Sequence, residues 1–161
     1  LLLHLHSGPT ALFVRQARAA GIDIPIVAGS AMHQPSTAAL LEPSELNGVC
    51  AESGSSPISG GNAEIERFVI DYRKRFGSDP DAFALGQYDA TEMVLAAAAG
   101  GATTPEAIRQ HLSQTRHRGL AMEYYSDGKG NMAHDAVIIC YDGSDRQPDI
   151  VKHYRAANPQ Y

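Results

Sequence analysis

Residues 1–30, LLLHLHSGPTALFVRQARAAGIDIPIVAGS, carry the pattern that decides the fold. Residues 1–5 are a short apolar run typical of a β-strand, and residues 8–21 place apolar side chains at helical spacing before ending at a glycine. A second apolar run follows at residues 24–30. This order predicts two parallel strands joined by a helix that packs on their sheet. We expect the helix to face the core with Leu12, Phe13, Ala17 and Ala20.

The alternation continues in the next two segments. Residues 35–42 predict a short helix with Ser36 as its N-cap, and residues 47–53 predict a third strand. The first 53 residues therefore indicate an α/β fold with a parallel sheet. In open sheets of this class, ligands bind beyond the carboxyl ends of the strands. Those ends correspond here to residues 6–8, 29–31 and 52–53.

The organisation changes after the third strand. Residues 54–61, GSSPISGG, have the composition of a loop or a crossing between structural units. Residues 62–77 predict an amphipathic helix that ends at a glycine. Residues 81–101 predict a second helix, apolar on all sides and therefore expected to be buried. Residues 103–115 predict a third helix, with Thr104 as its N-cap and a proline at its first position.

Strand signals return in residues 120–143. This stretch predicts two strands around a turn at residues 127–131, DGKGN. Three helices thus interrupt an α/β pattern that begins before them and resumes after them. The pattern favours one chain that visits two structural units over a single doubly wound sheet.

Composition limits the possible partners. The chain has 161 residues and a formal net charge of -5 at pH 7, without a basic stripe, so nucleic acid is not an expected partner. No apolar run approaches the roughly 20 residues of a membrane helix. The sequence begins within a strand pattern and without methionine, so we expect a longer precursor whose export signal lies outside this segment.

The two cysteines, Cys50 and Cys140, lie in separate apolar strand patterns. Cysteine is among the residue types that are most often buried, so two separate buried thiols are the favoured interpretation. A disulfide is the alternative, and it requires an oxidising compartment. A shared metal is disfavoured because neither cysteine has a nearby partner at zinc-ligand spacing.

The sequence does not contain the motifs that are typical of dedicated catalysis or of cofactor binding. The seven histidines include His4 and His6 on one strand face, yet neither has a further ligand at a defined offset, so no metal is predicted. No G-x-S-x-G elbow or phosphate-binding glycine loop is present, and residues 127–131 fit a hairpin turn better than a calcium loop. We predict no enzyme activity and no cofactor.

Four stretches occur in the order and spacing of a known family. They are LFVRQARAAGIDIPIVAGS (12–30), NGVCAES (47–53), FVIDYRKRFGSDPDAFALGQYDATEMVLAAA (68–98) and GLAMEYYSDGKGN (119–131). Together they resemble the leucine/isoleucine/valine-binding type of periplasmic solute-binding protein, the receptor component of branched-chain amino acid ABC transporters. The resemblance covers essentially the whole chain. It implies that the chain corresponds to the C-terminal half of a family member.

The resemblance implies a type I periplasmic-binding-protein fold, in which two Rossmann-like lobes are joined by a hinge. Residues 1–53 would form part of the second lobe, and residues 54–61 would form a crossing segment. Residues 62–118 would return into the first lobe as helices. Residues 119–161 would provide the second crossing and the final strands of the second lobe.

Ligand contacts are implied at the ends of the first two strands. The positions that match the family's contacts are His6 and Ser30, and neither supplies the carboxylate that would bind an α-ammonium group. A histidine and a serine beside a helix N-terminus suit a carboxylate ligand. Ser7, His33 and Gln34, which are adjacent in sequence to these positions or close to them, are further candidates.

The Tyr88-Asp89 pair is a family feature of a different kind. In the family it belongs to a helix of the first lobe near the crossings. The resemblance therefore implies a hinge or structural role for Tyr88 and Asp89 in preference to a ligand contact.

The implied function is that of a periplasmic receptor. It would bind an aliphatic amino acid or an aromatic or short-chain carboxylate between its lobes, close about the hinge, and present the solute to an ABC transporter permease. One alternative is a ligand-sensing domain of a signalling receptor or regulator with the same fold. A second is a small α/β hydrolase that uses His6 or His33 with Ser30.

Overall fold

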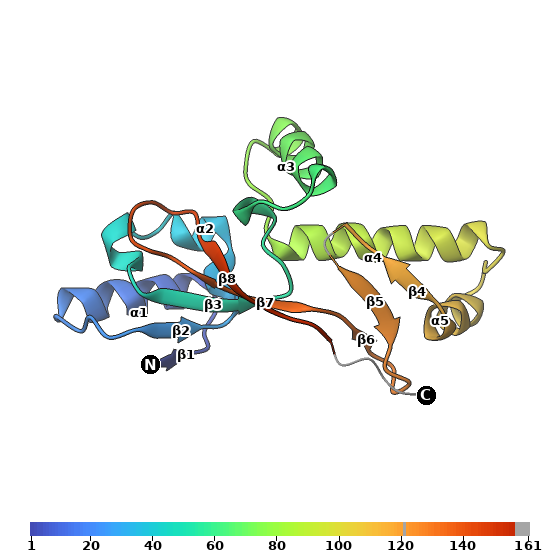
Figure 1. Cartoon of the computed structure of the whole chain (residues 1–161), viewed down its shortest axis with the longest axis horizontal. Helices are drawn as coiled ribbons and strands as arrows, with labels where there is room; N and C mark the ends of the chain where they lie inside the picture. Colours follow the sequence, from blue (N-terminus) through green and yellow to red (C-terminus); the bar gives the residue numbers. More distant parts are fainter. Residues whose placement is uncertain (121, 157–161) are drawn as a thin grey trace.

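The computed structural model describes residues 1–120 and 122–156, and it contains two sheets (Figure 1). The first has the strand order β1-β2-β3-β7-β8, with β1 to β3 parallel and with β7 and β8 antiparallel to their neighbours. The second is a smaller antiparallel sheet in the order β4-β5-β6. The α/β fold class predicted from the alternating pattern is confirmed.

The first sheet is built from both ends of the chain. Its strands are β1 (Leu2–Leu3), β2 (Ile26–Ala28), β3 (Val49–Ser53), β7 (Ala136–Cys140) and β8 (Asp149–Tyr154). The connections between its parallel strands contain α1 (Ser7–Ala19), α2 (Pro35–Ala38) and the single-turn 3₁₀ helices η1 (Ser30–His33) and η2 (Pro43–Leu46). The predicted Ser36 cap is wrong, because α2 already begins at Pro35 and Gln34 occupies the N-cap position.

A single apolar core joins this sheet to its helices. Its largest fully buried aliphatic side chains are Val14, Ile26, Met32, Leu41, Leu46, Val49 and Ile139. The face predicted for α1 is confirmed for Ala17, which is buried, and for Phe13, which packs partly buried against the core. It is wrong for Leu12, which is 55% exposed, and for Ala20, which is exposed as well; Thr10, Ala11 and Val14 are buried instead. Thr10 can face inward because its hydroxyl donates to the Leu5 carbonyl at 3.0 Å, so its burial leaves no unpaired donor.

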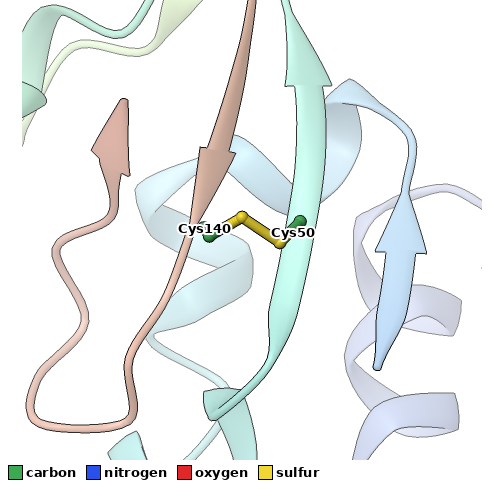
Figure 2. The surroundings of a disulfide bond; sticks show 2 residues. All are labelled: Cys50 and Cys140. Carbon is green, nitrogen blue, oxygen red and sulfur yellow. A yellow bond between two sulfur atoms is a disulfide. The ribbon is translucent and has the colours of Figure 1, made fainter. Parts of the chain in front are cut away.

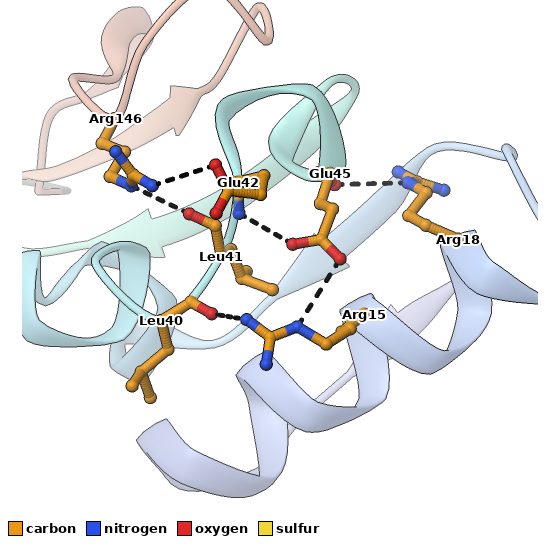
Figure 3. A network of polar contacts seen from close by, with 7 residues as sticks. All are labelled: Arg15, Arg18, Leu40, Leu41, Glu42, Glu45 and Arg146. Carbon is orange, nitrogen blue, oxygen red and sulfur yellow. Dashed lines mark hydrogen bonds and ion pairs between the residues drawn. The ribbon is translucent and has the colours of Figure 1, made fainter.

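Arginine side chains hold the loop that precedes β3 (Figure 3). Arg18 on α1 donates to the Glu45 carbonyl at 3.3 Å. It also donates to the Asn47 carbonyl at 2.9 Å. From the other side, Arg146 in the β7–β8 loop donates to the Leu41 carbonyl at 2.8 Å. The arginines thus provide hydrogen-bond donors for backbone carbonyls in and around η2, and the connection keeps a fixed path into β3.

The second unit contains the predicted helices and the small sheet. Its elements are η3 (Pro57–Ser59), α3 (Ala63–Phe76), α4 (Ala82–Ala99), α5 (Pro105–Gln114), β4 (Arg116–Arg118), β5 (Glu123–Ser126) and β6 (Met132–Ala133). The predicted stop of α3 is confirmed, because Gly77 adopts the left-handed conformation with φ of 68°. The Thr104 cap is confirmed as well, since its hydroxyl accepts the Ala107 N–H at 3.2 Å.

The composition of α4 predicted a helix buried on all sides, and this prediction is wrong. The buried residues recur every four positions and form one stripe: Leu85, Asp89, Met93 and Ala97. Large apolar side chains on the rest of its surface are exposed: Phe83, Tyr88, Val94 and Leu95. The packing partners in the described part of the chain cover only one side of the helix. None of the described helices is long and apolar enough to span a membrane.

The final strands divide between the two sheets. Asp127 accepts the backbone N–H groups of Lys129 and Asn131 and turns β5 back onto β6. The other edge of β5 pairs with β4, so this hairpin belongs to the small sheet, whereas β7 and β8 join the first sheet. The predicted segment 119–161 therefore spans both sheets, and its residues 121 and 157–161 lie outside the described ranges.

Cys50 and Cys140 form a disulfide, which corrects the preference for two separate buried thiols (Figure 2). The two residues are register partners on adjacent antiparallel strands, with their Cα atoms 4.0 Å apart. The sequence placed both cysteines in strands correctly. It did not indicate that β3 and β7, which are far apart in the chain, are neighbours.

Removal of this disulfide should destabilise the fold. Replacing both Cys50 and Cys140 by serine is expected to lower the free energy of unfolding by about 3 to 5 kcal/mol, because a cross-link over 90 positions restricts the unfolded chain. Urea unfolding of the oxidised parent, the reduced parent and the double variant measures the effect. The last two should share a midpoint that is lower than that of the oxidised parent; three equal midpoints would contradict the expectation.

Candidate functional site

A cavity of about 250 Å³ lies where the first sheet meets α4; we call it the junction pocket. Ser30 and Glu52, at the carboxyl ends of β2 and β3, line one side of it. Phe83 of α4 and Tyr124 of β5 line another side, together with His134. The pocket thus combines residues of both structural units at the sheet edge where open α/β folds bind ligands. Four larger hollows, of about 320 to 670 Å³, are lined by neither Ser30 nor Glu52.

Of the five predicted ligand contacts, the structure places Ser30 in this pocket. His6 is exposed at the N-cap position of α1, where its side chain makes no capping hydrogen bond. The Ser7 hydroxyl donates to the side-chain oxygen of Gln34, which joins the start of α1 to the loop after η1. These residues lie near the strand ends but outside the lining of the junction pocket.

His33 has a buried environment of its own. It is 1% exposed, and its Nε2 lies 2.7 Å from the Ser56 hydroxyl, which is in turn 2.6 Å from the Ser59 hydroxyl. The Ser59 hydroxyl donates to the Pro148 carbonyl, so the chain of contacts links η1, η3 and the β7–β8 loop. Burial lowers the pKa of His33 to about 4, and the charge of Asp81 opposes part of this shift.

This arrangement bears on the hydrolase alternative. That alternative paired His6 or His33 with Ser30, whereas the hydroxyl partner of His33 is Ser56. Both His33 and Ser56 are buried, and Ser56 continues into a chain of hydroxyl contacts. The His33–Ser56 pair therefore joins three segments, and it is not the pair with Ser30 that the alternative named.

Asp89 organises the wall of the junction pocket. It is 1% exposed on α4, accepts the Leu120 N–H at 2.9 Å, and accepts the Tyr124 hydroxyl at 3.0 Å. Gly119 lies directly against its carboxylate, since a Cβ there would approach Oδ2 to 2.2 Å. Burial raises the pKa of Tyr124, and the charge of Asp89 raises it further. The neutral phenol is therefore held as a hydrogen-bond donor with its ring at the pocket.

Tyr88 points about 100° around the helix from Asp89 and makes a different contact. Its ring is exposed and packs edge-on against Phe68 of α3, with ring centroids 5.3 Å apart. Adjacent positions on α4 thus have two separate environments, a buried hydrogen-bonding site for Asp89 and an aromatic surface contact for Tyr88. A hinge or structural role for the pair remains our proposal.

The ligand-contact prediction missed several residues of the pocket lining, among them Glu52, Phe83, Tyr124 and His134. Oε1 of Glu52 accepts the backbone N–H of Ser30 at 3.1 Å, while the side chain as a whole stays exposed. The available signal for Glu52 was its position at the end of the third predicted strand. Among the described residues, no cluster of three or more histidine, cysteine or acidic side chains is arranged to hold a metal.

Comparisons with known proteins agree with this architecture. The family model described as periplasmic binding protein matches residues 1–145. A search of curated proteins returned no match.

Three solved structures illustrate the likeness. One is the branched-chain amino acid transporter substrate-binding protein LivJ from Streptococcus pneumoniae in complex with isoleucine, 24% identical, with a TM-score of 0.77 over 94% of this chain and 44% of its own. The leucine-binding protein LivK from Thermotoga maritima is 24% identical, with a TM-score of 0.79 over 96% of this chain and 44% of its own. The third is an ABC transporter solute-binding protein from R. palustris in complex with benzoate. It is 16% identical, with a TM-score of 0.78 over 99% of this chain and 44% of its own.

The likeness to these three structures is one of fold. Each of them is 24% identical to this chain or less, a level at which the fold alone is shown to be shared. The chain spans about 44% of the length of each structure.

Asp89→Ala should destabilise the protein by about 2 to 4 kcal/mol, because it leaves the Leu120 N–H and the Tyr124 hydroxyl without their acceptor. Urea unfolding measures this loss. Glu92→Ala, an exposed carboxylate on the same helix, is the matched control and should change stability by less than about 0.5 kcal/mol. Equal effects of the two substitutions would contradict the assigned role of Asp89.

The buried His33 should make the fold sensitive to acid. Its pKa is about 4 in the folded state against 6.5 as the ordinary value, so between these pH values the unfolded chain binds more protons. Its contribution should lower the free energy of unfolding by about 3 kcal/mol as the pH falls from 7 to 4.

Urea unfolding of the parent and of His33→Gln across this pH range measures the contribution. The variant should show a shallower decline than the parent. His153→Gln, at an exposed position of β8, serves as the control and should retain the parent's slope. An unchanged slope in His33→Gln would contradict the prediction.

Proposed function

Because the chain belongs to the periplasmic binding protein family, we propose that it forms part of an extracytoplasmic receptor that binds a small solute between two lobes. The observation that carries this proposal is the junction pocket, which is lined by the ends of β2 and β3 and by residues of α4 and β5. A ligand that contacts both units stabilises the arrangement of the units in which it binds most tightly. Ligand binding would therefore shift the protein toward a closed form.

The proposed lobes and hinge correspond to the two sheets. We assign residues 1–53 and the strands β7 and β8 to the second lobe, and residues 62–133 to the first. Residues 54–61 and 134–135 would be the crossing segments. Ser53 pairs with Val137, so the two crossings begin side by side, which suits a hinge about which the lobes rotate.

The compartment and the partners belong to the same proposal. A disulfide between β3 and β7 suits an oxidising environment such as the periplasm, and the signal for export would lie outside this segment. The related structures are described with isoleucine and with benzoate, which supports an amino acid or a small aromatic carboxylate as the solute here. The closed form would deliver this solute to an ABC transporter permease, and no bond would be made or broken.

Among the predicted contacts, we propose that Ser30 touches the solute within the pocket, while His6, Ser7 and Gln34 would contribute at the rim formed by the strand ends. His33 would act indirectly, because its buried hydrogen bond to Ser56 holds η1 against the first crossing.

Thermal unfolding and solution scattering of the full-length protein test the proposal. Isoleucine, leucine and benzoate are the first ligands to add. A compound at 100 times its dissociation constant should raise the free energy of unfolding by about 2.7 kcal/mol and should also reduce the radius of gyration. If none of these compounds changes either the melting temperature or the radius, the proposed solute class is wrong.

A further inference from the structure

A second cavity, of about 320 Å³, lies beside the first proposed crossing, and we call it the crossing pocket. Several residues of the segment 54–61 line it, and both structural units contribute to it. Ile65 of α3 and Leu85 of α4 come from the helical unit, whereas Val137 of β7 and Ile150 of β8 come from the first sheet. Its volume lies within the range of roughly 300–1,000 Å³ that is usual for small-molecule sites. The crossing pocket is therefore large enough for a ligand of its own.

The crossing pocket adjoins the junction pocket but is a separate cavity. Residues 54–55 and Met122 line both, so this part of the chain forms their shared wall. Glu52 lines the junction pocket, whereas Val137 lines the crossing pocket. Glu52 pairs with Ile138, and side chains alternate between the two faces along a strand, so Glu52 and Val137 point to opposite faces of the first sheet. The two cavities therefore lie on different sides of the sheet edge.

Two hydroxyl groups in the lining, those of Ser56 and Ser59, are already committed as donors. The Ser59 hydroxyl donates to the Pro148 carbonyl, so at 2.6 Å from Ser56 its oxygen accepts the Ser56 proton. The Ser56 oxygen in turn accepts from Nε2 of His33 at 2.7 Å. A hydroxyl group has one proton and two acceptor lone pairs. Both serines therefore have no proton left for a ligand and can offer it only an acceptor.

The carboxylate of Asp135 adds further acceptors to the crossing pocket. Its Oδ1 accepts the backbone N–H of Ala156 at 2.9 Å. A carboxylate has about four acceptor sites on its two oxygens, so this contact leaves capacity for a ligand. The other ionisable residue in the described lining is His153, which is exposed, and no lysine or arginine is found there. The pocket thus suits a ligand that donates a hydrogen bond and carries no negative charge.

Ser55 supplies a hydroxyl that the fold does not use. The residue is 5% exposed, and its hydroxyl makes no hydrogen bond within the described part of the chain. Every deeply buried polar side-chain atom of the described residues has a partner, so the Ser55 oxygen must reach open space. Ser55 lines both cavities, so this space lies at their shared wall. A polar group in such a position is available to a bound molecule.

Apolar side chains complete the lining: Pro57, Ile65, Leu85, Met122, Val137 and Ile150. We propose that the crossing pocket is a second ligand site, for a small uncharged molecule that has an apolar body and a hydroxyl group. The apolar body would cover the aliphatic side chains, and the oxygen atoms of Asp135 and the serines would accept the hydroxyl proton. A carboxylate is disfavoured, because Asp135 would repel it without a lysine or arginine in the lining to offset the repulsion. This site goes beyond the proposed function, whose solute would bind in the junction pocket.

A pair of probes with the same ring and different head groups tests this ligand class. Cyclohexanol and cyclohexanecarboxylate are titrated separately into the full-length protein, with the methyl groups of isoleucine, leucine and valine observed by NMR. Cyclohexanol should shift the methyl resonances of Ile65, Leu85 and Ile150 and show nuclear Overhauser effects to them. Cyclohexanecarboxylate should bind at least roughly 10-fold more weakly, because of the charge of Asp135.

Ile150→Phe should abolish the binding of cyclohexanol, because the larger side chain fills the cavity. Val151→Phe makes the same kind of change at the next position of β8, whose side chain is 56% exposed and is not part of the lining. This control should bind cyclohexanol as the parent does. Thermal unfolding of both variants checks that each of them folds.

Asp135→Asn tests the chemistry of the site without changing its shape. Asparagine retains an oxygen that can accept the Ala156 N–H, and the variant removes the negative charge. The affinity for cyclohexanecarboxylate should rise by roughly 10-fold, while the affinity for cyclohexanol should change little. Asp149→Asn, at an exposed position of β8 outside the lining, is the matched control and should bind both probes as the parent does.

Three results would each overturn the second site: no response of these methyl groups to cyclohexanol, equal binding of it by Ile150→Phe and Val151→Phe, or equal binding of the two probes by the parent. If Ile150→Phe does not fold, the change in preference expected for Asp135→Asn decides the matter. These measurements contain no solute, so a negative result leaves the proposed receptor function untouched. Isoleucine, leucine and benzoate test that function separately, through thermal unfolding and scattering.

Discussion

The antiparallel pairing of β3 with β7 is the constraint on which the rest of the structure depends. It places Ser53 opposite Val137, so the chain leaves the first sheet and returns to it at neighbouring positions. Everything between them, residues 54–135, is attached to the sheet through two adjacent connections. The disulfide between Cys50 and Cys140 fixes the register of these strands, so a slip of one strand against the other would require breaking a covalent bond.

A buried carboxylate performs the corresponding task in the second unit. Asp89 binds the backbone just before β5 and the hydroxyl of Tyr124 within β5, which fixes the small sheet against α4. The close fit depends on Gly119, where any side chain would overlap the carboxylate. Because α4 also carries Phe83, the same network sets the distance between two aromatic residues of the junction pocket. The walls of the pocket are therefore held by the Cys50–Cys140 disulfide in the first sheet and by the hydrogen bonds of Asp89 in the second unit.

The local pattern of the chain was sufficient to predict most elements, and contacts between distant segments account for the errors. Gly77 and Thr104 mark helix ends through backbone geometry and capping, which act within a few residues and are visible in sequence. The disulfide depended on which strands become neighbours, and this is decided by tertiary pairing. Leu12 was assigned to the core because it is apolar, whereas Thr10 is buried because a carbonyl five residues earlier accepts its hydroxyl.

The site was predicted less completely for the same reason. Ser30 was identified from its place at a strand end, but the contact of Glu52 with it becomes apparent only when β2 and β3 lie side by side and the carboxylate accepts the Ser30 N–H. In the described part of the chain, every deeply buried side-chain nitrogen or oxygen has a hydrogen-bond partner. Interior polar groups such as His33 and Asp89 are thus committed to holding segments together. Polar groups that remain accessible, such as Glu52 in the lining of the junction pocket, are not committed in this way.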